Sequence, residues 1–295
     1  GDVYKRQSQF SGDLLDLLGR MDVLCHVVRG FDSNTVPHPM ITVDPRRDIA
    51  AQNDELILND MLSVERKLDQ LKIEWEKGGG RDRSVIEREQ YLFARMLAVL
   101  EDSRPIRQME LTPDENRLLS GHYLLTRKPI IIVLNVGGNA ASLDEIFAVD
   151  YGRYTPEWFI VLRGRLEMEI SQLDPDDAEL FLKEYGLDQA CRYRMSELAL
   201  DALDMHRFFT VVREEVRAWT VPVGSTALEA AGRIHSDMRS GFIKTEVTAF
   251  EDLQNCGSED AAKAAGKWRL EGKDYLVQDG DIMCIRFSPP ANVKK

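Results

Sequence analysis

The chain lacks the residue patterns of metal sites, disulfide frameworks and membrane spans. Its 295 residues include only four cysteines and five histidines, and neither CxxC nor HExxH occurs. We therefore expect no metal site, no disulfide framework and a reducing, cytoplasmic location. The longest apolar run, at 130–134, is far too short to cross a bilayer. The polar start shows no signal peptide, and residues 1–7 are interpreted as a cloning or assembly junction.

Positive charge is scarce, and a phosphate-binding loop is missing. The chain has 38 basic and 50 acidic residues, which excludes a general polyanion binder because neutralising phosphates needs clustered Lys and Arg. The pattern GxxxxGK[ST] occurs nowhere, and the glycine run at 78–80 follows no strand pattern and precedes no Lys-Ser or Lys-Thr. The chain therefore lacks the parts that hold the β- and γ-phosphates and Mg²⁺, and we predict no catalytic residue.

Short apolar runs at 22–28, 129–136 and 158–162 predict three buried strands. Helices are predicted at 175–185 and 197–209. Strand and helix patterns alternate along the chain, which indicates a parallel sheet with right-handed crossovers.

A long helical insertion lies between the first two predicted strands. Asp44-Pro45 is a favourable helix start. Apolar residues then recur at heptad spacing. These residues are Ile57, Met61, Val64, Leu68, Leu71 and Trp75. The glycines at 78–80 interrupt the pattern, which resumes over 84–100. Because two such seams joined by a glycine turn must fold back on each other, we predict an antiparallel helical arm.

The last third of the chain predicts a second, smaller α/β domain. Its strand-like runs are 218–221, 243–249, 275–277 and 281–287. They surround one helical run, which starts at a capping box formed by Thr226 and Glu229. This pattern is typical of one helix over a curled sheet.

Asn135, at the end of the second strand, is the candidate ligand-binding residue. In α/β folds, ligands bind at the carboxyl ends of the strands, where an amide side chain can meet a purine edge. From this residue alone, a turn cap before Gly137 is the simpler interpretation. The stretch 162–167, LRGRLE, likewise reads as a plain turn from strand to helix.

Two charged clusters also have competing interpretations. The acidic residues Glu167, Glu169, Asp174, Asp176 and Asp177 are interpreted as a solvated helix face rather than an acid–base pair. A basic set lies beside the aromatic residues Trp268 and Tyr275. It consists of Lys244, Lys263, Lys267, Arg269 and Lys273. An RNA contact and a mixed-charge surface remain equally open for this set.

Several segments in order resemble one known family. DVLCHVVRGFDSNTV, VDPRRDIAAQNDELILNDM and LTPDENRLLSGHYLLTRKPIIIVLNV are similar to successive parts of the YchF family, the Obg-related P-loop NTPases that end in a TGS domain. FFTVVREEVRAWTV resembles the junction into that domain, and RLEGKDYLVQDGDI is close to diagnostic of it. The resemblance covers nearly the whole chain after Gln7.

The resemblance implies an α/β fold: a partial P-loop NTPase sheet, or G domain, interrupted by a coiled-coil arm and followed by a β-grasp TGS domain. The implied divisions are a G-domain remnant at 1–44, the arm at 45–110, the rest of the G domain at 111–214 and the TGS domain at 215–295. The part that would hold the phosphate loop is absent, so we expect an N-terminally truncated member.

The resemblance also implies a base-binding site. The family's Asn-x-x-Glu motif matches Asn135-Val136-Gly137-Gly138, where Gly138 replaces the glutamate and leaves the choice between ATP and GTP open. The loop LRGRLE resembles a family loop that packs near the base, which adds Gly164 and Arg165 to the site.

Members of the family are cytoplasmic NTPases that associate with ribosomes and act in translation and stress responses. The resemblance therefore implies ATP or GTP with Mg²⁺ in the intact parent, and the large subunit or the intact ribosome, or RNA, as partner. We expect this chain to be inactive alone. The alternative is a non-catalytic docking module, in which the arm and the TGS domain bind the ribosome or RNA.

Overall fold

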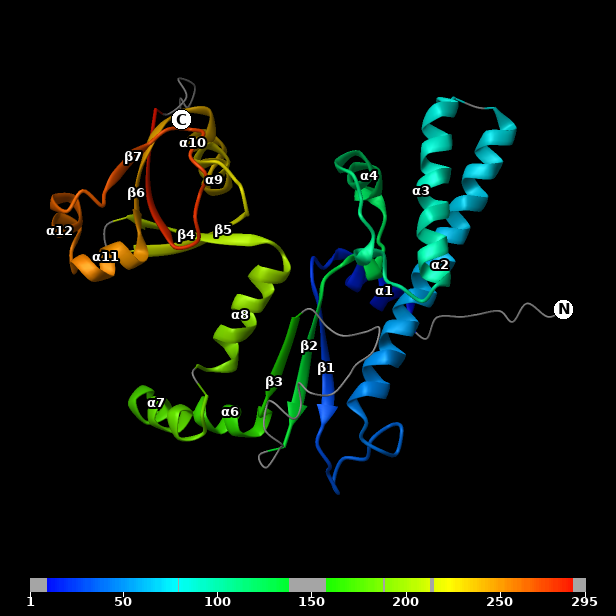
Figure 1. Ribbon diagram of the computed structural model, residues 1–295, viewed down its shortest axis with the longest axis horizontal. Coiled ribbons are helices and arrows are strands. Elements are labelled where there is room, and N and C mark those ends of the chain that lie inside the picture. Colours follow the sequence, from blue (N-terminus) through cyan, green and yellow to red (C-terminus); the bar gives the residue numbers. More distant parts are fainter. Residues whose placement is uncertain (1–9, 79, 138–157, 188, 213–214, 289–295) are drawn as a thin grey trace. The chain divides into compact units, whose positions relative to one another are not determined.

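The computed structural model describes residues 10–78, 80–137, 158–187, 189–212 and 215–288 (Figure 1). The chain divides into two compact units, Gly1–Ala202 and Leu203–Lys295, called here the first and second units. Among the described residues, no helix is long and apolar enough to cross a membrane.

The first unit is built on a parallel sheet in the order β1-β2-β3. Its strands are β1 (Leu24–Gly30), β2 (Ile130–Val136) and β3 (Trp158–Leu162). All three lie where the apolar runs predicted them. Central strand β2 is buried on both faces, which explains its almost continuous run of isoleucine, valine and leucine.

The helical arm consists of α2 (Pro45–Lys77) and α3 (Arg83–Glu101), which pack against each other. Asp44 caps α2 by accepting a hydrogen bond from the Arg47 N–H. The helix ends at Gly78, whose φ of +63° favours glycine. The predicted seam residues of α2 all belong to or pack against the hydrophobic core, which confirms the heptad interpretation.

Asp60 connects the arm to the sheet. Its side chain is 0% exposed and accepts hydrogen bonds from the Leu125 N–H (2.9 Å), the Thr126 N–H (2.7 Å) and the Thr126 hydroxyl (2.6 Å). Residues 125 and 126 lie in the short turn that leads into β2. Burial raises the pKa of the Asp60 carboxyl, and the hydrogen bonds from Thr126 and Leu125 oppose that rise. This carboxylate therefore fixes the base of the arm against the start of the central strand.

The opposite face of the sheet is covered by α8 (Cys191–Ala202), which packs on Ile131, Val133 and Ile160. The predicted helix at 197–209 is wrong beyond Ala202, because residues 205–212 form a strand of the second unit. The other helices are α1 (Gly12–Arg20), η1 (Ile106–Gln108), α4 (Pro113–Leu118), η2 (Leu119–Gly121), η3 (Leu125–Arg127), α6 (Gly164–Ile170) and α7 (Pro175–Glu184).

The second unit is a five-stranded sheet in the order β5-β4-β8-β6-β7. Its strands are β4 (Met205–Val212), β5 (Glu215–Pro222), β6 (Phe242–Ala249), β7 (Arg269–Glu271) and β8 (Asp281–Phe287). Its helices are α9 (Ala227–Ile234), α10 (Ser236–Ser240), α11 (Phe250–Cys256) and α12 (Glu259–Ala264). The capping box of Thr226 and Glu229 is confirmed at the start of α9.

Two predictions for the second unit need correction. The unit begins at Leu203 rather than at residue 215, because β4 pairs with both β5 and β8 and so belongs to this sheet. The run at 275–277 is not a strand, since only Leu276 makes an isolated bridge, to Thr226. The core lies between the sheet and α9, with Phe208, Val221 and Met283 among its buried residues.

Glu89 in α3 gives the arm an expected pH dependence. Its carboxylate pairs with Arg81 and lies 3.4 Å from the Lys67 Nζ. Burial alone would raise the pKa of Glu89, but the hydrogen bond from Arg81 and the charge of Lys67 outweigh burial and lower it. The stabilisation is therefore present above the ordinary pKa of 4.5 and is lost as the pH falls through the lower folded-state pKa.

We expect Glu89→Gln to reduce the change in the free energy of unfolding between neutral and acidic pH. Urea unfolding of the wild type and the variant at about pH 6 and about pH 3 measures the difference. The wild type should lose more stability between these two pH values than the variant. Equal losses would show that the Glu89 pairing does not contribute.

Candidate functional site

The candidate site lies at the carboxyl end of the first-unit sheet. Strand register places Arg29, Asn135 and Leu162 side by side in one row across β1, β2 and β3. This is the edge at which open α/β sheets bind ligands. The structure thus positions Asn135 in the middle of that edge.

Asn135 is held by the loop that follows β3. Its Oδ1 accepts a hydrogen bond from the Gly164 N–H at 3.2 Å. A Cβ on Gly164 would lie 2.8 Å from that oxygen and 3.3 Å from both Cγ and Nδ2. A side chain at position 164 would therefore push the Asn135 amide out of this place. The structure brings Asn135 and Gly164 into contact.

We expect Gly164→Val to displace the Asn135 side chain and to lower the free energy of unfolding by about 1–3 kcal/mol, because overpacking forces neighbours to shift. Urea unfolding measures the loss. Gly121→Ala is the control, since nothing lies within 4 Å of a Cβ at Gly121. A Gly164→Val chain as stable as the control would contradict the close approach.

Arg165 is on the exposed surface of α6. Its side chain is 89% exposed, and its Nε lies 3.0 Å from Glu169 Oε1, one turn along α6. The side chain of Val136 is buried in the core on the other face of the sheet. Of the predicted residues, Asn135 and Gly164 therefore share one contact, whereas the Arg165 side chain pairs with Glu169 and the Val136 side chain lies in the core. Gly138 lies outside the described residues.

Glu167, in α6, has a buried side chain, and the prediction that it is solvated is wrong. Its side chain is 7% exposed and accepts hydrogen bonds from the Cys191 N–H and from Arg194 Nη2, both at 2.7 Å. Arg194 also donates from Nη1 to the Val161 carbonyl at 3.1 Å. This network ties the start of α6 to α8 and to β3. Sequence reasoning missed it because Arg194 is 27 residues downstream.

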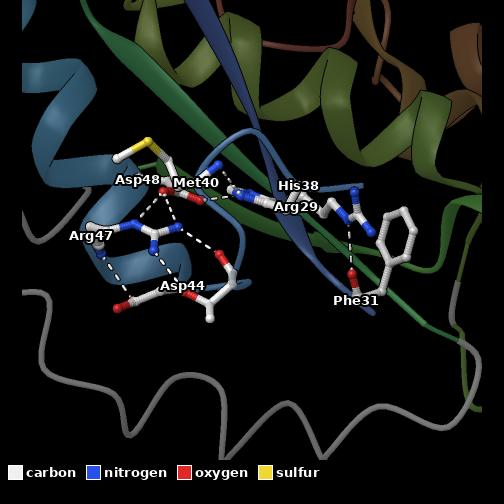
Figure 2. Close-up of polar contacts among 8 residues, drawn as sticks. Arg29, Phe31, His38, Met40, Asp44, Arg47 and Asp48 are labelled. Atoms are coloured by element: carbon white, nitrogen blue, oxygen red, sulfur yellow. Dashed lines mark hydrogen bonds and ion pairs between the residues drawn. The ribbon is translucent and has the colours of Figure 1, made fainter. Parts of the chain in front are cut away.

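The end of β1 and the loop after it add two residues that the motif analysis did not predict, Arg29 and Phe31. Arg29 donates from Nε to the Phe31 carbonyl at 2.9 Å, and its guanidinium lies 4.8 Å from the centre of the Phe31 ring. Figure 2 shows the two side chains lying against each other. A Cβ on Gly137 would lie 3.7 Å from the Phe31 Cβ. The Phe31 side chain, with the Arg29 guanidinium against its ring, therefore lies close to Gly137, two residues after Asn135.

The same loop is closed by His38. Its Nε2 lies 3.1 Å from Asp48 Oδ2, and its Nδ1 accepts a hydrogen bond from the Met40 N–H at 3.1 Å (Figure 2). Arg47 holds Asp48 from the other side, with Nε 2.9 Å from Oδ1. Both ring nitrogens of His38 are used in these contacts, so the cluster fixes the path from β1 into α2.

Within the described ranges, no group of three His, Cys, Asp or Glu side chains could hold a metal ion. The whole sequence also lacks GxxxxGK[ST]. We therefore assign no step to a metal ion in this chain.

The predicted basic set lies in the second unit, and most of its members have carboxylate partners. The ion pairs are Lys263 with Glu259 (3.5 Å), Lys267 with Asp252 (3.1 Å) and Arg269 with Glu271 (3.5 Å). The Lys263 Nζ also lies 4.7 Å from the centre of the Trp268 ring. Lys244 is on β6, and Lys273 precedes β8. This geometry favours the mixed-charge interpretation, and the RNA contact stays a prediction.

Comparisons with known proteins agree with these two units. A family described as "YchF-GTPase_C: Protein of unknown function (DUF933)" matches residues 205–288. Ribosome-binding ATPase YchF of Pasteurella multocida is 36% identical over 271 residues, which cover 90% of this chain and 73% of that protein. Obg-like ATPase 1 of Caenorhabditis elegans is 31% identical over 289 residues, 92% of this chain and 70% of that protein.

A solved structure is similar over both units. The YchF GTPase of Schizosaccharomyces pombe superposes with a TM-score of 0.79 at 27% identity, covering 96% of this chain and 77% of that chain. The likeness in sequence and in fold extends through the strands, the helical arm and the C-terminal sheet. The chain therefore belongs to the YchF family.

Proposed function

We propose that this chain is a ribosome-associated, nucleotide-binding protein of the YchF type. The main support is the position of Asn135 at the carboxyl edge of the sheet, where the Gly164 N–H holds its side chain. A second support is the similarity to a protein named ribosome-binding ATPase. In this proposal the first unit binds the base of ATP or GTP. The partner is the ribosome, through the large subunit or the assembled particle.

The hydrogen bond that Asn135 already makes determines which of its side-chain groups can bind a nucleotide base. Its Oδ1 already accepts the Gly164 N–H, which leaves the Nδ2 amide as a donor. N7 is an acceptor in both adenine and guanine, so this donor fits either purine and does not select between them. Phe31 supplies an apolar side chain close to Gly137. We infer that ATP and GTP bind with similar, weak affinity.

We propose no turnover by the chain itself. Cleaving a triphosphate needs backbone N–H groups around the β- and γ-phosphates and a Ser or Thr that holds Mg²⁺. The sequence provides neither in the form of a phosphate loop. Mg²⁺ would therefore accompany the nucleotide rather than occupy a site made by this chain.

Ribosome co-sedimentation tests the proposed partner. The full chain should pellet with purified 70S ribosomes in a salt-dependent manner, and a chain without residues 203–295 should pellet less. If neither form pellets at low salt, ribosome association is excluded. A competing docking-module function, in which the arm and the second unit bind without nucleotide, predicts the same pelleting by Asn135→Ala and by the wild type.

A further inference from the structure

A cavity in the second unit lies between its sheet and the helices α9 and α10. Its volume is about 330 Å³, within the range of sites that bind small molecules. Side chains from both layers form its apolar wall: Trp219, Ile234, Met238, Met283 and Ile285. Met283 belongs to the hydrophobic core of the unit, and Trp219 and Ile234 pack against it. The cavity is therefore continuous with that core.

The polar group of the wall already has a partner inside the wall. Trp219 Nε1 donates a hydrogen bond to the hydroxyl of Thr210, on β4, at 2.9 Å. The thioethers of Met238 and Met283 are weak acceptors, and these flexible side chains make favourable contacts with aromatic rings. The wall is therefore suited to an apolar or aromatic group rather than to a polar one.

Two opposite charges line the open end of the cavity. Glu215 and Arg217 lie two and four residues from Trp219 along β5, so all three side chains share one face of the sheet. Both charged residues line the cavity, and their side chains are 63% and 61% exposed, respectively. One face of β5 thus carries a solvated pair of charges that leads into an apolar interior.

The ion pair between these residues leaves part of each charged group available. Arg217 Nε lies 2.8 Å from Glu215 Oε1, and neither side chain has a second partner among the described residues. The two Nη groups of Arg217 remain, and such a pair of donors binds a carboxylate through two parallel hydrogen bonds. Glu215 Oε2 remains as an acceptor for an ammonium group. This end of the cavity therefore fits a head group that carries both charges.

We propose that this cavity binds a free α-amino acid with an apolar side chain, such as phenylalanine. Its carboxylate pairs with Arg217, its ammonium group pairs with Glu215, and its side chain enters the apolar wall beside Trp219. A ligand with only one charge would bring that charge close to a like charge of the protein, which favours the zwitterion. The site uses residues of the second unit alone, so its test does not depend on the proposed nucleotide binding.

Titration of the full chain with L-phenylalanine tests the proposal, followed by NMR of ¹³C-labelled methionine methyl groups. The signals of Met238 and Met283, identified with Met238→Leu and Met283→Leu, should shift and saturate. Three matched probes each lack one feature: 3-phenylpropionate has no ammonium group, 2-phenylethylamine has no carboxylate, and L-serine has no apolar side chain. Each should bind at least roughly tenfold more weakly, since each loses a charge-assisted hydrogen bond or the apolar contact.

Variants of the two charged residues assign the head group. Arg217→Gln and Glu215→Gln should each weaken L-phenylalanine binding roughly tenfold. Arg217→Gln should not weaken 2-phenylethylamine binding, because that probe has no carboxylate to lose. Lys273→Gln and Glu251→Gln are the controls, since they remove the same charges at exposed positions outside the cavity and should leave the dissociation constant unchanged.

Two kinds of result would overturn the proposal. The first is the absence of any shift at Met238 and Met283 up to the solubility limit of L-phenylalanine. The second is binding without the predicted head-group contacts, seen as equal affinity for 3-phenylpropionate or as unchanged affinity in both Arg217→Gln and Glu215→Gln. Both substituted side chains are exposed, so these variants are expected to fold, and thermal unfolding checks that they do.

Discussion

Asp60→Ala is expected to lower the free energy of unfolding of the first unit by about 3–5 kcal/mol, because each buried donor left without an acceptor costs about 1–3 kcal/mol. The carboxylate is the acceptor for two backbone N–H groups and for the Thr126 hydroxyl, all of them buried. Alanine would leave these donors without partners in a site that water does not reach. Urea unfolding followed by circular dichroism measures the loss.

Two further variants separate the role of Asp60 from general damage to α2. Asp60→Asn keeps one acceptor oxygen but turns an NH₂ group toward the remaining donors, so it should fall between the wild type and Asp60→Ala. Asp69→Ala in the same helix removes an exposed carboxylate and should change stability by less than about 0.5 kcal/mol. If Asp60→Ala matched Asp69→Ala, the joint between the arm and the sheet would not depend on this residue.

Glu167→Ala is the second large effect that we expect, a loss of about 3 kcal/mol. Removing this carboxylate leaves the mostly buried Arg194 guanidinium without its charge partner and the Cys191 N–H without its acceptor. The Arg194 Nε is already a buried donor with no acceptor among the described residues, so the guanidinium is incompletely paired even in the wild type. The start of α8 should therefore loosen from the sheet.

Hydrogen exchange distinguishes this local effect from global unfolding. The amides of α8 should exchange faster in Glu167→Ala, whereas those of α2 and α3 should exchange at nearly wild-type rates. Glu169→Ala is the control, since its only described ion pair is the exposed one with Arg165. Equal effects from the two substitutions would contradict the buried role of Glu167.

The regular elements follow from the sequence because they depend on local patterns. The heptad positions of α2 were readable because packing against α3 requires an apolar side chain about every 3.5 residues. The three parallel strands were readable because a strand buried on both faces, such as β2, needs a continuous apolar run.

The end of α8 could not be predicted from the sequence, because no glycine or proline follows the helix. The turn is made by Asp204, which adopts a left-handed φ of +52° and accepts a hydrogen bond from the Val223 N–H through its carbonyl. Aspartate tolerates this conformation better than most residues, but it also occurs within helices. Apolar residues continue on both sides, so the helical pattern concealed the start of β4.

The candidate site was only partly predictable, for a different reason. Asn135 could be placed at a strand end from its position after an apolar run. Its contact with Gly164 depends on β2 and β3 being neighbours in register, a relation 29 residues apart that no local pattern encodes. The burial of Glu167 likewise depends on where α8 brings Arg194.

Phosphate release by the purified chain, with Mg²⁺ and either ATP or GTP, tests the central claim most directly. Phosphate should be counted with and without ribosomes, alongside binding of a fluorescent nucleotide. We predict release no faster than in buffer alone, with weak binding of both nucleotides that Asn135→Ala weakens further. Mg²⁺-dependent release by the wild type that Asn135→Ala abolishes would contradict the account.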